Sequence, residues 1–229
     1  MLIKSGLITQ GSGSLGGVTL SRNRGGMYLR ARAIPTDPNS AQQAAIRGYL
    51  AQLSDRWTNN LTVDQLAAWA TYAANVPLIG PLGDPITLSG QQHYLRSNIP
   101  RLQASAAIVD DGPGIFDLGS FGAVSVVTAT APILISLAFT DTDDWVDEDG
   151  SLLLLYASRP VNTTINFFRG PYRFMDSVAG DAITPPTTPA ALLSPFIFVA
   201  GQRQFYRARV TRADGRLSNE VFIGPETTI

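Results

Sequence analysis

The chain lacks cysteine altogether and has a single histidine, His93, and together these facts exclude several kinds of site. Without cysteine there is no disulfide, no thiolate metal site and no cysteine nucleophile. A Ser-His-Asp or zinc site would depend on His93 alone, and its place early in a predicted helix favours a packed or capping side chain. We therefore predict no enzyme, no cofactor and no metal.

Charge is also scarce. Charged side chains make up 15% of the 229 residues, against the ~25% usual for globular proteins, and the formal net charge is −1. Surface that is buried in an assembly has this composition, and so does an Ala/Leu-rich monomer; we favour the assembly. The start of the chain has no apolar signal region. The longest apolar run, 152–157, is far below the ~20 residues of a membrane span, so we expect no membrane contact.

The first 36 residues are rich in glycine, and their charged side chains are all basic. They include Gly11, Gly13, Gly16, Gly17, Arg22, Arg24, Arg30 and Arg32, and the first acid is Asp37. Alternating residues on either side of the turn sequence Asn23–Gly26 predict a β-hairpin. Because a hairpin has little core of its own, we predict a basic β-arm over 1–36 that lies on another subunit.

The glycines also fit the G-x-G-x-x-G pattern of a dinucleotide-binding loop. Such a loop opens a helix, whereas Gly17 is followed by strand-like residues and no βαβ unit comes after it. We therefore interpret Gly11, Gly13, Gly16 and Gly17 as positions of flexible or close backbone packing. The arginines of the arm suit contacts with neighbouring subunits, and nucleic acid is the less favoured partner.

Three capping boxes predict three helices in a small helical domain over 37–109. The boxes are Ser40 with Gln43, Thr62 with Gln65, and Ser89 with Gln92. Apolar residues follow each box at helical spacing. Pro100 is expected to end or kink the third helix near Asn98.

Residues 110–120 contain Gly and Pro and suggest a domain boundary, after which the apolar period changes to two. Seven β-rich runs follow, at 124–130, 133–140, 151–158, 164–170, 194–200, 204–212 and 218–224. Short strands separated by turn sequences predict an antiparallel β-sandwich over 115–229. The predicted fold class is α+β, with a β-arm, a helical domain and a sandwich.

Two segments of this sandwich have unusual composition. Residues 167–174 are aromatic and basic, and Phe168, Arg169, Tyr172 and Arg173 form a candidate recognition edge for a glycan. Ordinary cross-strand packing is the favoured alternative. Residues 141–149 hold six acids but do not fit the register of an EF-hand, so we interpret them as a solvated loop.

Several motifs resemble known families. The segments "SLGG", "SRNRGG", "PNSAQQ" and "LTVDQLAAW" lie within residues 11–104. In combination they resemble a group of mostly uncharacterised proteins of tailed bacteriophages and prophages. Residues 204–224 are similar to the last two strands of fibronectin type III and other immunoglobulin-like modules, with matches at Tyr206, Arg209, Gly215 and Ser218.

The resemblance implies a structural protein located in the virion and made in the host cytoplasm. Its partners would be other virion proteins and further copies of itself. The C-terminal part would be an immunoglobulin-like sandwich of the kind that binds surfaces. We expect a capsid-decorating or cementing protein; a tail or neck component, or a carbohydrate- or cell-surface-binding module, are the alternatives.

Overall fold

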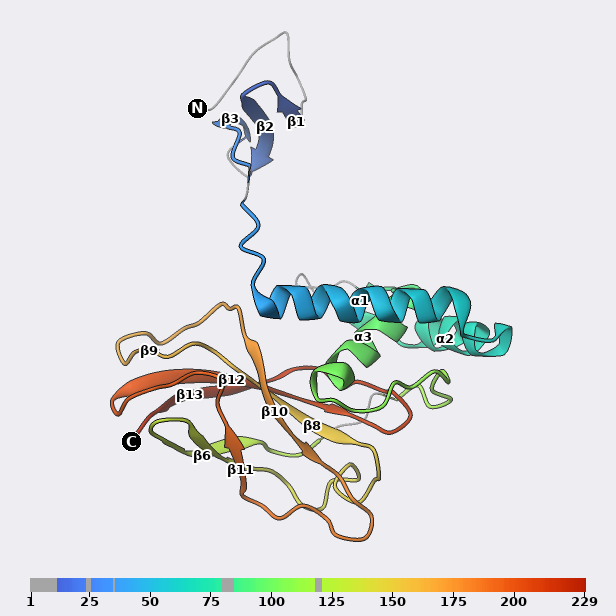
Figure 1. The fold of residues 1–229 in the computed structure, drawn as a ribbon, viewed down its shortest axis with the longest axis vertical. Helices are drawn as coiled ribbons and strands as arrows, with labels where there is room; N and C mark the ends of the chain where they lie inside the picture. Colours follow the sequence, from blue (N-terminus) through green and yellow to red (C-terminus); the bar gives the residue numbers. More distant parts are fainter. Residues whose placement is uncertain (1–11, 24–25, 35, 80–84, 118–120) are drawn as a thin grey trace. The chain divides into compact units, whose positions relative to one another are not determined.

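The computed structural model describes residues 12–23, 26–34, 36–79, 85–117 and 121–229 (Figure 1). The chain divides into two compact units, residues 1–44 and 45–229. Among the described residues it forms three helices and several antiparallel sheets, which confirms the mixed α+β class.

The first unit holds a three-stranded antiparallel sheet in the order β1-β2-β3. Its strands are β1 (Gly13–Leu15), β2 (Val18–Asn23) and β3 (Gly26–Ala31). The hairpin predicted around Asn23–Gly26 is confirmed, because Asn23 pairs with Gly26 and the pairing continues to Val18 and Ala31. Gly16 makes the turn from β1 to β2 at a φ of 58°, a conformation that glycine adopts without strain.

Three helices form where the capping boxes predicted them. They are α1 (Ala41–Asn59), α2 (Val63–Asn75) and α3 (Gly90–Gln103). In each box the Ser or Thr hydroxyl accepts from the backbone N–H of the Gln, whose side chain accepts from the backbone N–H of the cap. A short ribbon of β4 (Leu78–Ile79) and β5 (Pro85–Ile86) separates α2 from α3 in the chain.

The prediction that α3 ends near Asn98 is wrong, because the helix continues through Pro100 to Gln103. A proline inside a helix removes one backbone hydrogen bond and costs about 3 kcal/mol. Here the last turn is held by tertiary contacts. The Arg101 guanidinium donates from Nε to the Ala107 carbonyl at 2.8 Å and from Nη1 to the Arg212 carbonyl at 3.0 Å. These contacts offset the local cost of the proline.

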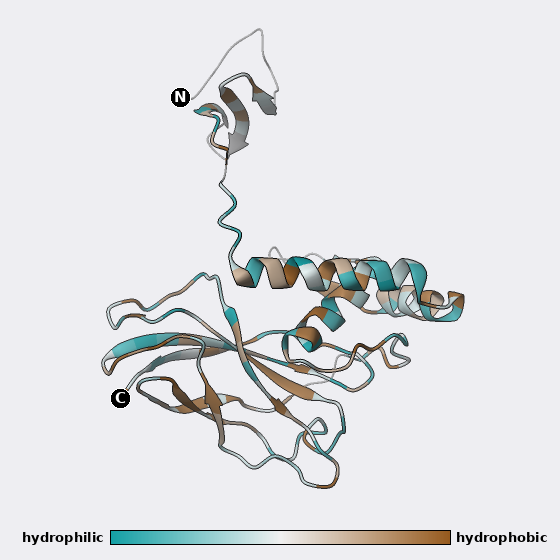
Figure 2. Cartoon of the chain, in the orientation of Figure 1, coloured by the Kyte–Doolittle hydropathy of each residue, from teal (hydrophilic) through white to brown (hydrophobic). Residues whose placement is uncertain are grey.

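The helices share an aromatic core. Its buried members are Leu53, Trp69, Tyr72, Val76 and Tyr94. The rings of Trp69 and Tyr94 meet edge to face with their centroids 5.6 Å apart, a geometry that aromatic pairs favour. α1 contributes only Leu53 to the fully buried set, and much of its surface is hydrophilic (Figure 2).

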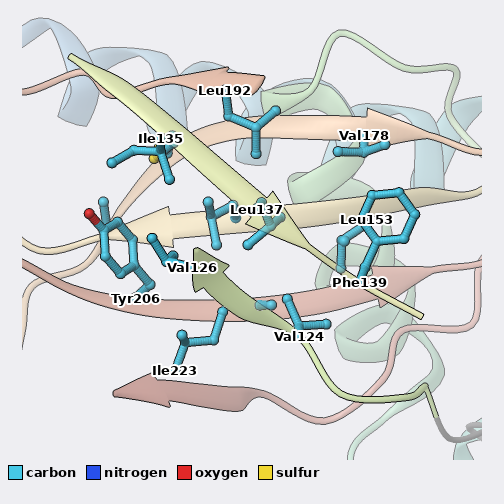
Figure 3. Close-up of a cluster of buried hydrophobic side chains, with 14 of the residues drawn as sticks. Val124, Val126, Ile135, Leu137, Phe139, Leu153, Val178, Leu192, Tyr206 and Ile223 are labelled. Atoms are coloured by element: carbon cyan, nitrogen blue, oxygen red, sulfur yellow. The ribbon is translucent and has the colours of Figure 1, made fainter. Parts of the chain in front are cut away.

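Two antiparallel sheets make up the C-terminal part, which we call the β domain. Its strands are β6 (Ser125–Thr130), β7 (Leu134–Ala138), β8 (Leu152–Ala157), β9 (Val161–Asn162), β10 (Arg173–Ala179), β11 (Ala190–Leu193), β12 (Gln202–Thr211) and β13 (Val221–Thr227). The large sheet has the order β10-β8-β12-β13, with β9 also pairing to β12, and the small sheet has the order β11-β7-β6. Alternate residues of both sheets form one hydrophobic core, in which Ile135, Leu153 and Tyr206 are fully buried (Figure 3).

Five of the seven expected strands are present, and two are wrong. Residues 164–170 and 194–200 are irregular, and the strands that the pattern missed are β10, β11 and the two-residue β9. Gly170, at a φ of 122°, lies at the end of the first wrong run. The second run contains Pro195, which cannot donate to a sheet. β11 has the sequence AALL, which has no β-branched residue to mark it as a strand.

α3 is bound to the β domain through arginines. Arg96 Nη1 donates to the Leu217 carbonyl at 3.3 Å, and Arg101 Nη1 donates to the Arg212 carbonyl. Beside them Leu152, Leu154 and Leu217 form a small hydrophobic cluster against Ala104 and Ala106, which follow α3. The helices and the β domain are therefore joined by both apolar packing and buried hydrogen bonds.

Candidate interaction surfaces

The predicted arm residues that the structure describes lie on the β1-β2-β3 sheet or beside it. Gly13 is in β1 with a φ of 118°, and Gly16 and Gly17 form the turn into β2. The glycines thus make a hairpin turn between two strands, without a helix to hold a phosphate. Gly17 also accepts a hydrogen bond at 2.9 Å from the N–H of Arg32.

The arginines of the arm are only partly described. Arg30 lies in β3 and Arg32 just after it, and both side chains are exposed. Arg22 is in β2, where its backbone pairs with Met27. Gly11 and Arg24 lie outside the described residues. The structure therefore places two exposed cations at the end of the arm where β3 ends.

The described part of the arm has no buried side chain. Every side chain with a described exposure from Ser12 to Ile34 is exposed or half-buried, including Leu15 at 81% and Ile34 at 78%. None of the three hydrophobic clusters contains a residue of this sheet. Its strands are paired through the backbone, and the Ser14 and Thr19 hydroxyls form a hydrogen bond of 2.8 Å.

The candidate recognition edge folds back on the large sheet. Phe168 stacks on Phe205 of β12 with centroids 5.9 Å apart, and Tyr172 meets Phe168 edge to face at 5.4 Å. The Tyr172 hydroxyl donates to the Phe168 carbonyl at 3.0 Å. These rings pack against the chain's own residues, which agrees with the packing alternative more closely than with an open aromatic platform for a glycan.

The arginines of this edge remain accessible. Arg169 and Arg173 are exposed, and the Arg173 guanidinium lies 5.3 Å from the centre of the Phe196 ring. The Arg207 guanidinium lies 4.2 Å from the centre of the Tyr172 ring and also pairs with Glu220 at 2.6 Å, so the accessible cations of the edge are Arg169 and Arg173. Cation–π contacts of this kind orient a guanidinium without neutralising its charge. The edge is therefore a cationic surface with aromatic supports.

The acidic segment 141–149 is a structured loop between β7 and β8. Asp143 accepts from the Gly122 N–H at 2.6 Å, Asp149 accepts from the Ala182 N–H at 2.8 Å, and Glu148 pairs with Arg212. Asp144 keeps 87% of its side chain exposed. Within the described residues no group of three His, Asp or Glu side chains is placed to hold a metal ion.

Asp110 is a structural centre that the sequence pattern did not identify. Its carboxylate accepts from Arg56 Nε at 2.7 Å, from Arg56 Nη2 at 2.5 Å and from the Tyr94 hydroxyl at 3.1 Å. Its carbonyl accepts from Trp69 Nε1 at 2.8 Å. The Arg56 hydrogen bonds hold the pKa of the Asp110 carboxyl below its usual value, and burial raises the pKa of Tyr94. The "DDG" sequence suggested a turn, and no local pattern links it to Arg56.

His93 is fully buried and packs edge to face on Tyr72 with ring centroids 5.3 Å apart. Burial lowers the pKa of His93, and the nearby Arg96 cation lowers it further. Burial also raises the pKa of Tyr72 to about 12. His93 is thus a packed side chain of the helical core, in keeping with the role that its position predicted.

Among the residues that the structure covers, no helix is both long and apolar enough to cross a membrane. No protein-family model, curated protein or solved structure matches the chain.

Proposed function

We propose that this chain is a structural protein of a tailed-bacteriophage virion, which decorates the capsid through contacts of its N-terminal arm. The observation that carries the proposal is a sheet without a core: β1, β2 and β3 pair, yet no described side chain among them is buried. A sheet of this size is stable only when a hydrophobic face is covered. A neighbouring virion protein would provide that cover.

The side chains of the arm indicate what kind of surface on the neighbouring protein would bind it. Leu15, Val18 and Ile34 are exposed apolar side chains, and Arg30 and Arg32 are exposed cations. The outer edges of β1 and β3 also carry backbone groups that pair with an added strand. The complementary surface would combine an apolar patch, carboxylates and a free strand edge.

The strand order of the β domain supports an immunoglobulin-like fold of the fibronectin type III kind. Named in chain order without β9, the strands give one sheet A-B-E (β6, β7, β11) and one sheet C′-C-F-G (β10, β8, β12, β13). Immunoglobulin-like sandwiches divide their strands between two sheets in this way. Such a domain would project from the particle or join neighbouring subunits.

The test is removal of the arm in the phage that encodes the chain. A chain lacking residues 1–36 should keep the far-UV circular dichroism expected for residues 37–229 and remain folded, because the buried core residues that the structure describes all lie beyond the arm. It should be missing from purified particles. Arg47→Ala, on the exposed surface of α1, is the matched control and should be incorporated normally.

Incorporation of the truncated chain at the level of the full chain would contradict the arm's role. A narrower variant, Arg30→Ala with Arg32→Ala, keeps the sheet and removes two exposed charges. It should detach from particles at a lower salt concentration than the full chain, because charge contacts are screened by salt.

A further inference from the structure

The two ends of the large sheet are far apart. At one end Leu152, the first residue of β8, pairs with Thr211, the last residue of β12. At the other end Gln202, the first residue of β12, pairs with Asn162 of β9. β12 has ten residues, which at about 3.3 Å per residue separates the ends by roughly 30 Å.

One end is basic. It carries Arg159, Arg169, Arg173 and Arg203, and the chain has no Asp or Glu in segments 150–175 and 182–213. The acid of β13 at this end is Glu226, opposite Gln204, and Arg207 is paired with Glu220. The side chains of Arg159, Arg169 and Arg173 are exposed. Phe167, in the same loop, is 75% exposed and adds apolar area. We call these residues the basic end.

The opposite end is acidic. The chain has nine Asp and Glu and no Lys or Arg between residues 102 and 158, and six of the nine lie in the loop 141–149. Asp141, Asp144 and Asp147 are exposed. Because Asp143, Glu148 and Asp149 are fixed by hydrogen bonds or ion pairs, the loop presents its exposed carboxylates from a held backbone. We call this loop the acidic end.

The two ends cannot meet within one molecule, since they terminate the same β domain on opposite sides. A second copy of the chain brings them together without any other partner. We propose that copies of this chain associate head to tail, with the acidic end of one copy seated on the basic end of the next. A contact between two different surfaces of identical subunits is heterologous, so it builds a ring or an open filament.

This association uses neither the arm nor any other virion protein, so it stands apart from the proposed function. The association is also electrostatic in origin. The net charge of the chain is only −1 because the charges of the two ends nearly cancel, so the net charge gives no sign of it. The Debye length falls from about 30 Å at 0.01 M salt to 3 Å at 1 M. The association should therefore be strong in low salt and weak in high salt.

The test is a charge exchange in the purified full chain, followed by sedimentation velocity in low salt. One variant reverses the basic end, Arg159→Asp with Arg169→Asp, and the other reverses the acidic end, Asp141→Arg with Asp147→Arg. All four side chains are exposed, so both variants should fold. Each alone should sediment as a smaller species than the original chain. Arg47→Asp changes an exposed residue of α1 that belongs to neither end, so it should not change the sedimentation.

An equimolar mixture of the two variants should recover the large species. In the mixture every contact again joins a negative end to a positive end, whether original or reversed. Failure of the mixture to recover, or unchanged sedimentation of both variants, would overturn the proposal. It would also be overturned if the original chain stays monomeric and its basic end instead binds heparin, since that end would then serve an anionic polymer.

Discussion

At the scale of single residues, Asp110 has the most consequence for stability. It joins Arg56 of α1 to Tyr94 of α3, and replacing the carboxylate by an amide removes the oxygen that accepts from Arg56 Nη2. Asp111 beside it contacts only Gln65, at an exposed site. The two neighbouring aspartates therefore form a matched pair for mutation.

We predict that Asp110→Asn lowers the free energy of unfolding by about 1–2 kcal/mol, allowing for partial solvent exposure of the pair. Asp111→Asn should change it by less than about 0.5 kcal/mol. Urea unfolding at neutral pH measures both. If Asp110→Asn and Asp111→Asn lower the free energy of unfolding equally, the hydrogen bonds of Asp110 do not stabilise the fold more than the contact of Asp111 does.

The ion pair of Asp110 with Arg56 also makes the free energy of unfolding depend on pH. The pKa of Asp110 is lower in the folded chain than its usual value, so its charge stabilises the fold above that usual value. The contribution is lost as the pH falls below about 4 and the folded carboxyl becomes protonated. The difference between the original chain and Asp110→Asn should therefore shrink in acid.

At the scale of elements, the capping boxes set the helix starts. In α2 the Thr62 hydroxyl accepts from the Gln65 N–H, which has no partner within the helix. Thr62→Ala should lower the free energy of unfolding by about 1 kcal/mol. Thr71→Ala, on the exposed face of the same helix, is the control and should cost nothing measurable, because Thr71 bonds only the Ala67 carbonyl. Urea unfolding measures both variants. If Thr62→Ala and Thr71→Ala lower the free energy of unfolding by similar amounts, the capping argument is contradicted.

Local signals explain which elements the sequence predicted well. The caps and the alternation of 204–212 act within a few residues, so α1, α2, the start of α3 and β12 were all found from the pattern. The misses depend on distant contacts. α3 passes Pro100 because Arg101 bonds carbonyls at 107 and 212. Likewise, Asp110 gains its role from Arg56, 54 residues away.

The surfaces were predictable only in part. The sequence indicated a basic hairpin arm and an aromatic edge, and the structure gives the hairpin its register and the edge its packing on Phe205. The opposed charge of the two ends of the large sheet was not visible, because it follows from strand pairing between residues as far apart in the chain as Leu152 and Thr211. Register, and not composition, places the acidic and basic loops at opposite ends.

At the scale of the whole molecule, the chain combines a folded unit with an arm whose described residues form no core of their own. Residues 45–229 carry the aromatic helical core and the core of the two sheets. The arm offers paired strands, exposed apolar side chains and exposed arginines. A protein built in this way is suited to being held on a larger particle by its arm.

If the proposed function is right, a phage or prophage encodes the chain, and the most direct test is quantitative mass spectrometry of virions purified from that phage. We predict that the chain is present in a fixed ratio to the capsid proteins and stays with the particles through gradient purification. Particles that are complete and infectious but contain none of the chain would contradict the central claim.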